Sequence, residues 1–558
     1  MYPVLIHTGS RLSARLLQQA SFCRWITSLS KTWSQEGMSQ TFQKITSQRG
    51  DYVARQVGDE LVDFSVGQPS PTMLPLQALV AATSHRLASP DAELLLQYGP
   101  RQGYRSFRQS LSTFLSARYG TAVHPDHLMV TAGVSHGLGL AVGRLARPGD
   151  LIVVECPTYF LVTPIFRDNH LTVVPMPTDE YGMVVEELER WLRQDPSHRP
   201  RLVYTIPIHN NPRGATLPPD RRRTLMRLAA EYDFVVLADE VYQLMTFPGH
   251  DHPSQGNGGG AGGPDGAAAD GSDDKKVRTA VPAHAEAGCS GAGAAAAAAA
   301  AGESSPYTAG GERRTDDGPP ASGVVAAAAA AAVAPPPPLR CQEGDALPLP
   351  LRCYEEECDP RDSRVVSFGS FSKMLAPALR LGWLECTNPA LLQRCREDGV
   401  VSSGGCIAQL ATGLAHSALE LGLQAAHLDG VVRPQLAARC TALVSALRRY
   451  LPPGSFESLV EPRGGYFLWL ELRKDIDSRR LLSLAESRHG VRFTPGPNCG
   501  GGPPHCLRLA FSFYNEAELE EGARRLGAAV RDYTDQQEAE KGSTTAPHAA
   551  AGAAETIQ

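Results

Sequence analysis

The sequence lacks the features that define several classes of protein. It has no uninterrupted apolar run of about 18 residues, which a membrane-spanning helix needs. Its 53 Lys and Arg stand against 59 Asp and Glu, and this lack of basic excess disfavours nucleic-acid binding. Its twelve cysteines include no CxxC pair, and Cys353 and Cys358, the nearest two, have no adjacent histidine. We therefore expect reduced, structural thiols and no metal site.

The N-terminal segment lacks acidic residues, the first of which is Glu36. It contains Arg11, Arg15 and Arg24 among serines and leucines, and a helix here would separate the arginines from the leucines. This composition is typical of a mitochondrial or plastid transit peptide, and the alternative is a disordered basic start. We therefore exclude residues 1–40 from the fold and expect a mitochondrial or plastid protein, with the cytoplasm as the alternative location.

A low-complexity segment over residues 249–350 contains almost no large apolar side chains. It holds alanine runs at 294–301 and 326–332 and a proline run at 335–338. Such a composition cannot bury enough surface to offset the entropy lost on ordering, and so short an alanine run does not hold a helix in water. We expect a disordered insertion inside a folded domain, and a disordered tail at 534–558.

The rest of the sequence alternates short apolar runs with amphipathic stretches. The apolar runs are LIVVECP, RLVYTIP, FVVLADE, RVVSF and LGWLEC. They do not alternate with polar residues, which indicates strands of a parallel sheet that is covered on both faces. Helices are predicted to begin near Ser135 and at Pro218–Asp220. This is the pattern of a doubly wound α/β fold, which binds ligands at the carboxyl ends of its strands.

Polar side chains follow three of these predicted strands. Asp239 ends FVVLADE and precedes Tyr242, Asn211 lies in the turn after RLVYTIP, and Lys373 follows RVVSF. Each has an ordinary explanation by itself, as a turn residue, a helix cap or a solvated charge. Together at one edge of a sheet they predict a site that contains a carboxylate, an amide and an amine.

A phosphate site is predicted beside them. VTAGVSHGLGLAV reads as a strand, a glycine turn and a helix that would present the backbone N–H groups of Val134 and Ser135 to an anion. Arg380 and Ser370, which flank Lys373 in sequence, would add a guanidinium and a hydroxyl. A reactive amine, an acidic partner and a phosphate site together indicate pyridoxal phosphate as the cofactor.

Five motifs resemble those of the class I and II aminotransferases of fold type I. They are SFSKMLAPALRLGW, HNNPRG, ADEVY, LQYGPRQGY and ECPTYF, and they occur in the family's order between about Asp63 and Arg531. The sequence is most similar in kind to 2-aminoadipate, kynurenine and aromatic aminotransferases. The resemblance implies a pyridoxal-phosphate-dependent transaminase that moves an amino group from an L-amino acid to a 2-oxo acid by a ping-pong mechanism.

The resemblance also implies the domains. It assigns residues 96–394 to a large cofactor-binding domain with a mostly parallel, doubly wound sheet, which the insertion interrupts. It assigns 41–95 and 395–533 to a smaller α+β domain built from both chain ends. Asp239 and Lys373 are 134 positions apart, farther than in the family, and the excess matches the insertion.

Roles at the cofactor ring follow from the resemblance. It implies that Lys373 forms the internal aldimine and then carries a proton between the substrate Cα and the cofactor, and that Asp239 keeps the ring nitrogen protonated. It implies that Asn211 and Tyr242 bind the phenolic oxygen of the ring and that Tyr159 stacks on its face. Because cations and partial desolvation lower the pKa of an amine, we expect the pKa of Lys373 to be depressed.

Further roles concern the phosphate, the substrate and the partner subunit. The resemblance assigns the phosphate to Val134, Ser135, Ser370, Ser372 and Arg380. It assigns the substrate carboxylate to Arg508, places Gly67 and Asn211 against the substrate, and has Tyr98 reach the phosphate of a second subunit in a homodimer.

The sequence departs from the family pattern in the HNNPRG turn, where Arg213 stands, and at Ala378. We expect Arg213 to face solvent, with an acidic substrate side chain as the alternative partner, and Ala378 to be unstrained if its φ is negative. A glycine-rich stretch precedes Arg508. Arg463 is a second candidate for recognising the substrate side chain, and His136 is interpreted as a polar residue at a helix start.

Two other functions share these residues. A pyridoxal-phosphate lyase, such as a carbon–sulfur lyase or a cyclopropane-forming synthase, would use the same cofactor site on the same fold. A non-catalytic regulator would carry an N-terminal helix-turn-helix domain, for which residues 1–60 are too short.

Overall fold

The computed structural model describes residues 60–249, 348–355 and 359–544. These residues belong to one compact unit. The transit peptide predicted at 1–40 lies outside them, as does most of the insertion predicted at 249–350. The cysteines within these ranges form no disulfide with one another.

The central element is an eight-stranded sheet. In spatial order its strands are β2 (Leu128–Thr131), β9 (Gly382–Glu385), β8 (Val365–Ser370), β7 (Val235–Asp239), β6 (Pro200–Thr205), β3 (Leu151–Cys156), β4 (Thr172–Asp179) and β5 (Gly182–Met183). Strands β8, β7, β6, β3 and β4 are parallel, whereas β9 is antiparallel to both of its neighbours. The predicted α/β fold with a mostly parallel sheet is confirmed, and each of the quoted apolar runs forms a strand.

Both faces of this sheet are covered, as the lack of alternation predicted. On β3, Ile152 and Val154 face one buried cluster, which includes Leu138 of α5. Val153, between them, faces a second cluster, which includes Leu188 of α7 and helix α8. Successive side chains of a strand point to opposite faces, so β3 contributes apolar residues to two separate cores.

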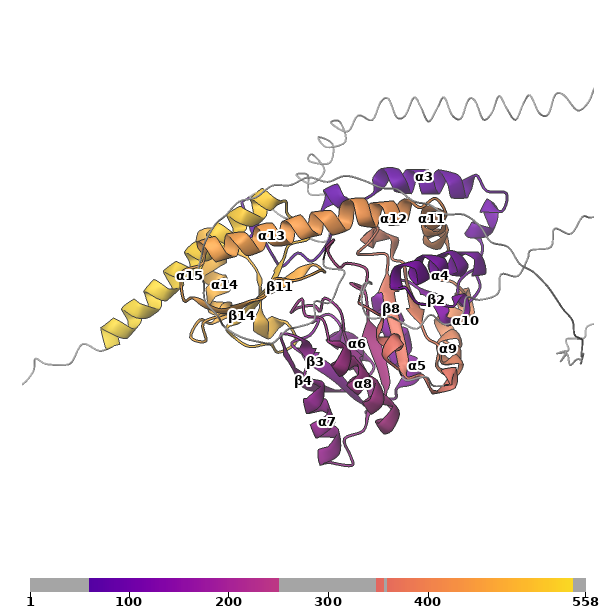
Figure 1. Cartoon of the computed structure of the whole chain (residues 1–558), viewed down its shortest axis with the longest axis horizontal. Helices are drawn as coiled ribbons and strands as arrows, with labels where there is room; N and C mark the ends of the chain where they lie inside the picture. The colour runs from indigo at the N-terminus through magenta and orange to yellow at the C-terminus, as the bar shows by residue number, and fades with distance from the viewer. Residues whose placement is uncertain (1–59, 250–347, 356–358, 545–558) are drawn as a thin grey trace, which may run out of the picture. The chain divides into compact units, whose positions relative to one another are not determined.

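Helices cover the two faces of the sheet, and further helices lie outside these two layers (Figure 1). They are α3 (Leu76–Leu87), α4 (Arg105–Tyr119), α5 (Val134–Leu145), α6 (Thr163–Asp168), α7 (Val185–Gln194), α8 (Pro219–Tyr232), α9 (Pro389–Arg396), α10 (Gly399–Gly404), α11 (Gln409–Glu420) and α12 (Leu423–His427). The helices predicted from Ser135 and from Pro218–Asp220 are α5 and α8, each of which starts within one residue of the predicted position.

The C-terminal part is a separate small sheet with helices against it. Its strands are β10 (Phe456–Leu459), β11 (Phe467–Leu472), β14 (Cys506–Ala510) and β13 (Thr494–Pro495), and its helices are α13 (Arg433–Tyr450), α14 (Ser478–His489) and α15 (Glu516–Thr544). Figure 1 shows α13 and α15 side by side. The N-terminal strand β1 (Val62–Asp63) pairs with β12 (Val491–Arg492), so this part uses both ends of the described chain.

The packing differs from the predicted boundaries in two places. Helix α11 packs against α4 and α3, so the boundaries predicted near 95 and 395 cut through one group of helices. Helix α15 continues to Thr544, and Gln537 donates a 2.8 Å hydrogen bond to the Asp475 carbonyl. Residues 534–544 therefore belong to a packed helix, where we expected a disordered tail.

The predicted insertion leaves the strands on either side of it paired. Strands β7 and β8 are neighbours in register, although the segment 250–347 lies between them in sequence. The returning chain is held firmly: the Leu351 amide donates to Glu240 at 2.6 Å, and Arg222 donates to the Leu349 carbonyl at 2.7 Å. The segment predicted as an insertion therefore joins two strands that are neighbours in the sheet.

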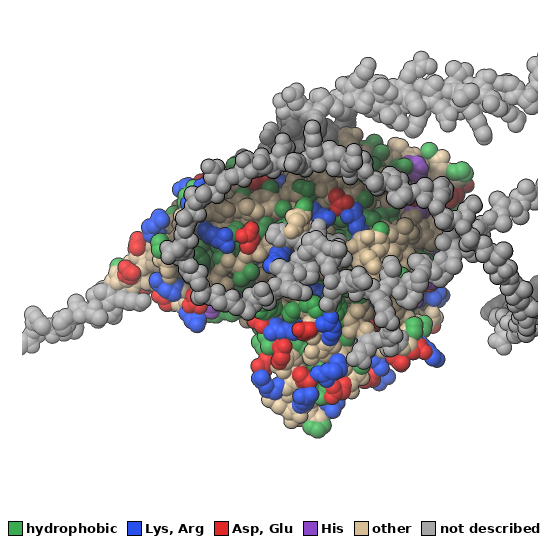
Figure 2. Space-filling view, viewed as in Figure 1, with side chains coloured by type: hydrophobic (Ala, Val, Ile, Leu, Met, Phe, Trp, Pro, Cys, Tyr) green, Lys and Arg blue, Asp and Glu red, His purple; other side chains and the backbone are tan. Residues whose placement is uncertain are grey.

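Charges of both signs interleave on the surface formed by α7 and α8 (Figure 2). Glu189 accepts ion pairs from Arg193 at 2.7 Å and from Arg227 at 2.6 Å. Such pairing on adjacent helices is typical of a solvated face and stabilises it only slightly.

Candidate active site

Side chains from several loops meet at the carboxyl edge of the parallel strands. Asp239 ends β7, Lys373 follows β8, Asn211 lies in the turn after β6, and Tyr159 follows β3. Because these strands are parallel, their carboxyl ends share one edge of the sheet. The charges of Asp239 and Lys373 act on each other's pKa, which shows that the carboxylate and the amine are close.

Asp239 is a buried carboxyl group with one satisfied oxygen. Its side chain is 4% exposed, and Tyr204 donates a 2.8 Å hydrogen bond to Oδ2. The other oxygen, Oδ1, is buried and makes no hydrogen bond to a described residue. Burial raises the pKa of Asp239 to about 6, and the Tyr204 hydroxyl and the charge of Lys373 limit that rise. The group is thus a carboxylate near neutral pH with one acceptor available.

Lys373 lies with its amine inside the protein. Its Nζ donates a 3.2 Å hydrogen bond to the Gly67 carbonyl. Burial lowers the pKa of Lys373 to about 8, and the charges of Arg508 and Arg380 act in the same direction. Asp239 opposes the shift. The expected depression of this pKa is confirmed, and a substantial fraction of the amine is neutral at slightly alkaline pH.

Arg508 lies on β14 and is held on several sides. Its Nη1 donates to Oδ1 of Asn211 at 3.1 Å, and its Nη2 donates to the Ser65 carbonyl at 3.0 Å and to Oγ1 of Thr494 at 3.2 Å. Its guanidinium carbon lies 4.3 Å from the centre of the Phe467 ring. These contacts fix the plane of a buried guanidinium, which can bind a carboxylate in a bidentate manner.

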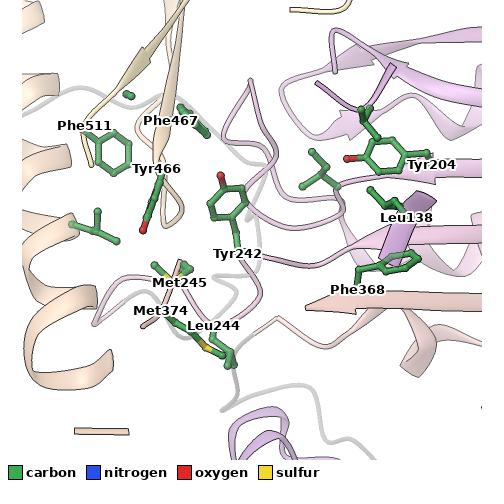
Figure 3. Close-up of a cluster of buried hydrophobic side chains, with 14 of the residues drawn as sticks. Leu138, Tyr204, Tyr242, Leu244, Met245, Phe368, Met374, Tyr466, Phe467 and Phe511 are labelled. Carbon is green, nitrogen blue, oxygen red and sulfur yellow. The ribbon is translucent and has the colours of Figure 1, made fainter. Parts of the chain in front are cut away.

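Tyr242 belongs to an aromatic cluster that separates the two sheets. Figure 3 shows it between Tyr466 and Phe467 on one side and the strand that carries Tyr204 on the other. Its ring centre is 5.6 Å from that of Tyr466 and 6.2 Å from that of Phe467. The Tyr466 hydroxyl donates to the Lys373 carbonyl at 2.9 Å, so the cluster also holds the loop that carries the lysine.

Tyr159 lies close to the charged groups of the site. Burial raises the pKa of its hydroxyl, and the charges of Asp239, Arg508 and Arg380 also act on it. The ring is partly buried against the core. The structure therefore brings Tyr159 to the same edge as the carboxylate and the arginines.

The predicted phosphate residues gather at the start of α5. Val134 is its first residue, after Gly133 with a φ of 81°. A Cβ built on that glycine would lie 3.1 Å from the Arg380 guanidinium, so the arginine lies beside the helix N-terminus. Ser370 is buried and accepts a 3.0 Å hydrogen bond from the Ser372 amide, which draws both serines into one turn.

Three other residues named in the sequence analysis have surroundings of their own. The Tyr98 side chain is 86% exposed. Arg463 is exposed, and its backbone carbonyl accepts a bond from the Phe247 amide. His136 accepts a 3.2 Å hydrogen bond from the Ala132 amide, as expected of a residue at a helix start.

The structure corrects the expectation for Arg213 and answers that for Ala378. Arg213 is mostly buried rather than solvent-facing, with a side chain 12% exposed, and it forms a 3.0 Å ion pair with Glu471. Its guanidinium carbon lies 5.8 Å from the centre of the Trp469 ring. Ala378 lies in the turn Pro377–Leu379 with a negative φ, because the left-handed conformation falls on Arg380, whose φ is 46°.

The sequence alone did not identify the residues that contact and hold the side chains of the site. Tyr204 stands in a predicted strand and in no other motif, although a buried tyrosine hydroxyl needs a hydrogen-bond partner. Phe467 and Thr494, which contact Arg508, carry no motif of their own. Glu155, inside a predicted strand, was the one signal available, because a carboxyl group in an apolar run must be compensated.

Two features are absent from the ranges that the structure describes. No helix there is long and apolar enough to cross a membrane. Nor do those residues include a group of three or more His, Cys, Asp or Glu side chains that could hold a metal ion.

Comparisons with known proteins give one consistent result. The family model described as aminotransferase class I and II matches residues 59–304 and 343–526. Aromatic-amino-acid aminotransferase 1 of Thermococcus litoralis is 24% identical over 478 residues, which cover 85% of this chain and 88% of the relative.

Solved structures resemble the chain over most of its length. A kynurenine aminotransferase of Pyrococcus horikoshii, in complex with PMP, KYN and KYA, superposes with a TM-score of 0.61 at 22% identity, covering 91% of this chain and 99% of that one. The alpha-aminoadipate aminotransferase LysN of Thermus thermophilus, complexed with N-(5'-phosphopyridoxyl)-L-leucine, gives 0.60 at 23%, covering 86% and 94%. At these identities the likeness shows a shared fold.

Proposed function

Because this chain belongs to the family of class I and II aminotransferases, we propose that it is a pyridoxal-phosphate-dependent transaminase that uses a ping-pong mechanism. The membership that five motifs predicted is confirmed. One observation carries the proposal: the amine of Lys373 and the buried carboxylate of Asp239 lie at the carboxyl edge of the large sheet, and the buried guanidinium of Arg508 on β14 reaches that edge through its hydrogen bond to Asn211. Its substrates are an L-amino acid and a 2-oxo acid.

The residues present fit pyridoxal phosphate. The buried Oδ1 of Asp239 makes no hydrogen bond to a described residue and suits a protonated ring nitrogen. At the other end of the site, Gly133 leaves the N-terminus of α5 uncovered beside Arg380. A helix N-terminus and a guanidinium together favour a phosphate dianion.

Lys373 and Asp239 are the residues that act on protons in the proposed reaction. Bound pyridoxal phosphate supplies an aldehyde that reacts with amines and a ring that withdraws electrons from the substrate Cα. Lys373 would hold the cofactor through its amine and would carry the proton at the substrate Cα. Its pKa of about 8 suits a base that works near neutral pH. Asp239 holds the proton on the ring nitrogen.

The remaining cofactor residues position the ring and the phosphate. Asn211 and Tyr242 bind the phenolic oxygen, and Tyr159 stacks on the ring face. The phosphate residues are Val134, Ser135, Ser370, Ser372 and Arg380. These residues would hold the ring and the phosphate in place, and such positioning contributes to rate.

Substrate binding centres on Arg508, which clamps the α-carboxylate. Asn211 orients the guanidinium through the 3.1 Å hydrogen bond to Nη1. Gly67 is proposed to lie against the substrate. A Cβ at this position would be 2.6 Å from the Phe467 ring, so only glycine lets the backbone pass here. The Gly67 carbonyl also accepts the hydrogen bond from Lys373.

The enzyme acts as a homodimer in which Tyr98 of one subunit reaches the phosphate in the other. The proposal is supported by exposed apolar side chains around Tyr98. They are Leu94, Leu96, Val400 and Ile407, which are 60%, 74%, 66% and 44% exposed. Such a patch on the described surface is typical of a protein–protein contact.

Location and domain assignment rest on the sequence and the packing. We keep the mitochondrial or plastid matrix as the proposed location, from the composition of residues 1–40. The large cofactor-binding domain spans 96–394 without the insertion, and the small domain combines 41–95 with 395–533, apart from the shared group of α3, α4 and α11.

A donor and acceptor panel tests the function. The purified protein is incubated with single L-amino acids and either 2-oxoglutarate or pyruvate, and the amino acid formed from the acceptor is measured. A transaminase forms glutamate or alanine in amounts that match the loss of donor, and initial rates at varied concentrations of both substrates give parallel reciprocal plots. Release of a 2-oxo acid and ammonia with no acceptor consumed would instead identify the lyase.

A further inference from the structure

Glu155 is a buried carboxyl group beside the site that has no role in the proposed function. It lies on β3, and its side chain is 1% exposed. Oε1 accepts a 2.6 Å hydrogen bond from the Thr205 hydroxyl. Oε2 accepts bonds from the Ile206 amide at 3.2 Å and from Nδ2 of Asn210 at 2.7 Å. All three donors belong to the end of β6 and the turn that follows it.

A carboxyl group at this position is costly, so its three hydrogen bonds need a reason. Burial without compensation is strongly unfavourable for a carboxylate, and burial raises the pKa of Glu155 to about 7, with the hydrogen bonds opposing the rise. The nearby charge of Asp239 also raises it. An apolar side chain would fill the same space, but it would leave Nδ2 of Asn210 with only its long 3.5 Å bond to the Ile206 carbonyl.

Asn210 connects Glu155 to the whole HNNPRG turn. Its side-chain Oδ1 accepts a 3.2 Å hydrogen bond from the backbone amide of Arg213. Its backbone amide donates to the Ala215 carbonyl at 2.8 Å, and its backbone carbonyl accepts from the Gly214 amide at 2.6 Å. The next residue is Asn211, whose Oδ1 accepts from Arg508. A shift of Asn210 must therefore move Asn211 relative to the arginine.

We propose that Glu155 is a positioning residue that acts through Asn210. Its carboxyl group clamps the turn against the end of β6, and this clamp keeps Asn211 aligned with both the cofactor ring and Arg508. The inference rests on the proposed function, since it concerns how a cofactor-binding asparagine is held. It distinguishes Glu155 from the residues that touch the cofactor or the substrate.

Two substitutions separate hydrogen bonding from charge and from volume. In Glu155→Gln, the amide oxygen can accept from Ile206 and Asn210 while the amide nitrogen donates to the Thr205 hydroxyl, so the clamp survives without a charge. In Glu155→Leu, the volume is similar but no acceptor remains. The matched control is Glu385→Leu, because Glu385 is 4% exposed and pairs with Arg352 at 2.6 Å, away from the HNNPRG turn.

The measurements are made on the cofactor-loaded protein and go beyond turnover. They are the Kd for pyridoxal phosphate, the pH titration of its visible absorbance, and kcat and KM for the amino donor. We expect Glu155→Leu to raise the Kd about tenfold, as the loss of an acceptor for a buried donor does. We expect kcat/KM to fall by up to about 100-fold, as displaced positioning groups do, with a shifted absorbance titration.

Each outcome supports or overturns the inference. It is supported if Glu155→Gln stays within about threefold of wild type while Glu155→Leu does not, and if Glu385→Leu lowers the Tm without moving the absorbance titration. It is overturned if Glu155→Leu lowers only the Tm, or if Glu155→Gln is as damaging as Glu155→Leu.

A second variant covers poor folding of Glu155→Leu. Asn210→Ala removes the 2.7 Å bond to Glu155 and leaves the other two bonds of that carboxyl group in place. The inference predicts the same changes in Kd and absorbance titration, and unchanged values would overturn it. Wild-type protein that neither binds pyridoxal phosphate nor transaminates would refute the proposed function itself, which keeps the two failures distinct.

Discussion

At the scale of single residues, one hydrogen bond from Tyr204 lowers the pKa of Asp239. Its hydroxyl donates to Oδ2 at 2.8 Å and lowers the pKa of a carboxyl group that burial raises to about 6. As pH falls through that value, Asp239 gains a proton and can no longer pair, as a carboxylate, with a protonated ring nitrogen. Cofactor affinity is therefore expected to decline on the acid side.

The variant Tyr204→Phe moves that decline to higher pH. Loss of the donor destabilises the carboxylate, and a hydrogen bond to a charged group corresponds to a pKa change of about one unit or more. The measurement is the Kd for pyridoxal phosphate across the mildly acidic to neutral range. Tyr181→Phe, at a tyrosine that is 53% exposed, is the control. An unmoved acid limb in Tyr204→Phe would contradict this account.

In the proposed mechanism Lys373 carries the proton transfer, so its removal separates chemistry from binding. Lys373→Ala is expected to lower turnover by at least the 10²–10⁴-fold that general acid–base catalysis contributes. The phosphate and ring contacts remain, so pyridoxal phosphate still binds. Turnover comes from the donor panel, and cofactor retention from dialysis followed by absorbance. Lys474→Ala, at a lysine whose side chain is 77% exposed, should match wild type. Wild-type transamination by Lys373→Ala would rule out the assigned role.

At the scale of one element, the turn before α5 has a glycine with a positive φ, which puts no side chain of its own over the N-terminus of the helix. Gly133 has a φ of 81°, and a Cβ there would lie 3.1 Å from Arg380. Gly149 has a φ of 90°, and a Cβ there would meet nothing within 4 Å. An alanine at either position destabilises the folded backbone by about 1–3 kcal/mol. Only Gly133→Ala also crowds the proposed phosphate site.

We therefore expect both glycine variants to lower the Tm, and only one of them to weaken anion binding. Gly133→Ala should raise the Kd for pyridoxal phosphate and for inorganic phosphate about tenfold or more, whereas Gly149→Ala should leave both Kd values unchanged. Equal effects of the two variants on phosphate binding would mean that the start of α5 does not hold the phosphate.

We expect the β7–β8 connection to tolerate removal of most of the segment between the two strands. Deletion of residues 255–335 leaves the paired strands and the contacts of Leu349 and Leu351 with Arg222 and Glu240 intact. We expect folded protein with kcat/KM within about threefold of the full chain, measured by circular dichroism and the donor panel. Glu240→Ala in the full chain should lower the Tm, because it removes the acceptor for the Leu351 amide. An inactive, unfolded deletion variant would show that the insertion is more than a spacer.

At the scale of the whole molecule, the exposed Tyr98 predicts that one subunit completes the site of another. A heterodimer of Tyr98→Phe and Lys373→Ala subunits tests this directly. If Tyr98 acts on the partner, one of the two sites has both residues intact and activity returns to about half of wild type per dimer. If Tyr98 acts within its own subunit, neither site is intact. Light scattering on the wild-type chain gives the mass, and a monomer that is fully active would contradict the dimer.

The sequence by itself determined the chemistry and the edge of the sheet where it occurs. Apolar runs without alternation require strands buried on both faces, and parallel strands bring Asp239, Asn211 and Lys373 to one edge whatever the details of packing. These are local properties, because each depends on a few neighbouring residues.

Only the tertiary structure decided which side chains support that edge. Arg213 meets Glu471, 258 positions away, and Arg508 meets the Ser65 carbonyl, 443 positions away. The antiparallel direction of β9, the continuation of α15 to Thr544 and the clamp of Glu155 on Asn210 depend in the same way on packing between distant segments. Such contacts form because buried polar groups must find partners wherever the fold brings them, and no spacing along the chain encodes that choice.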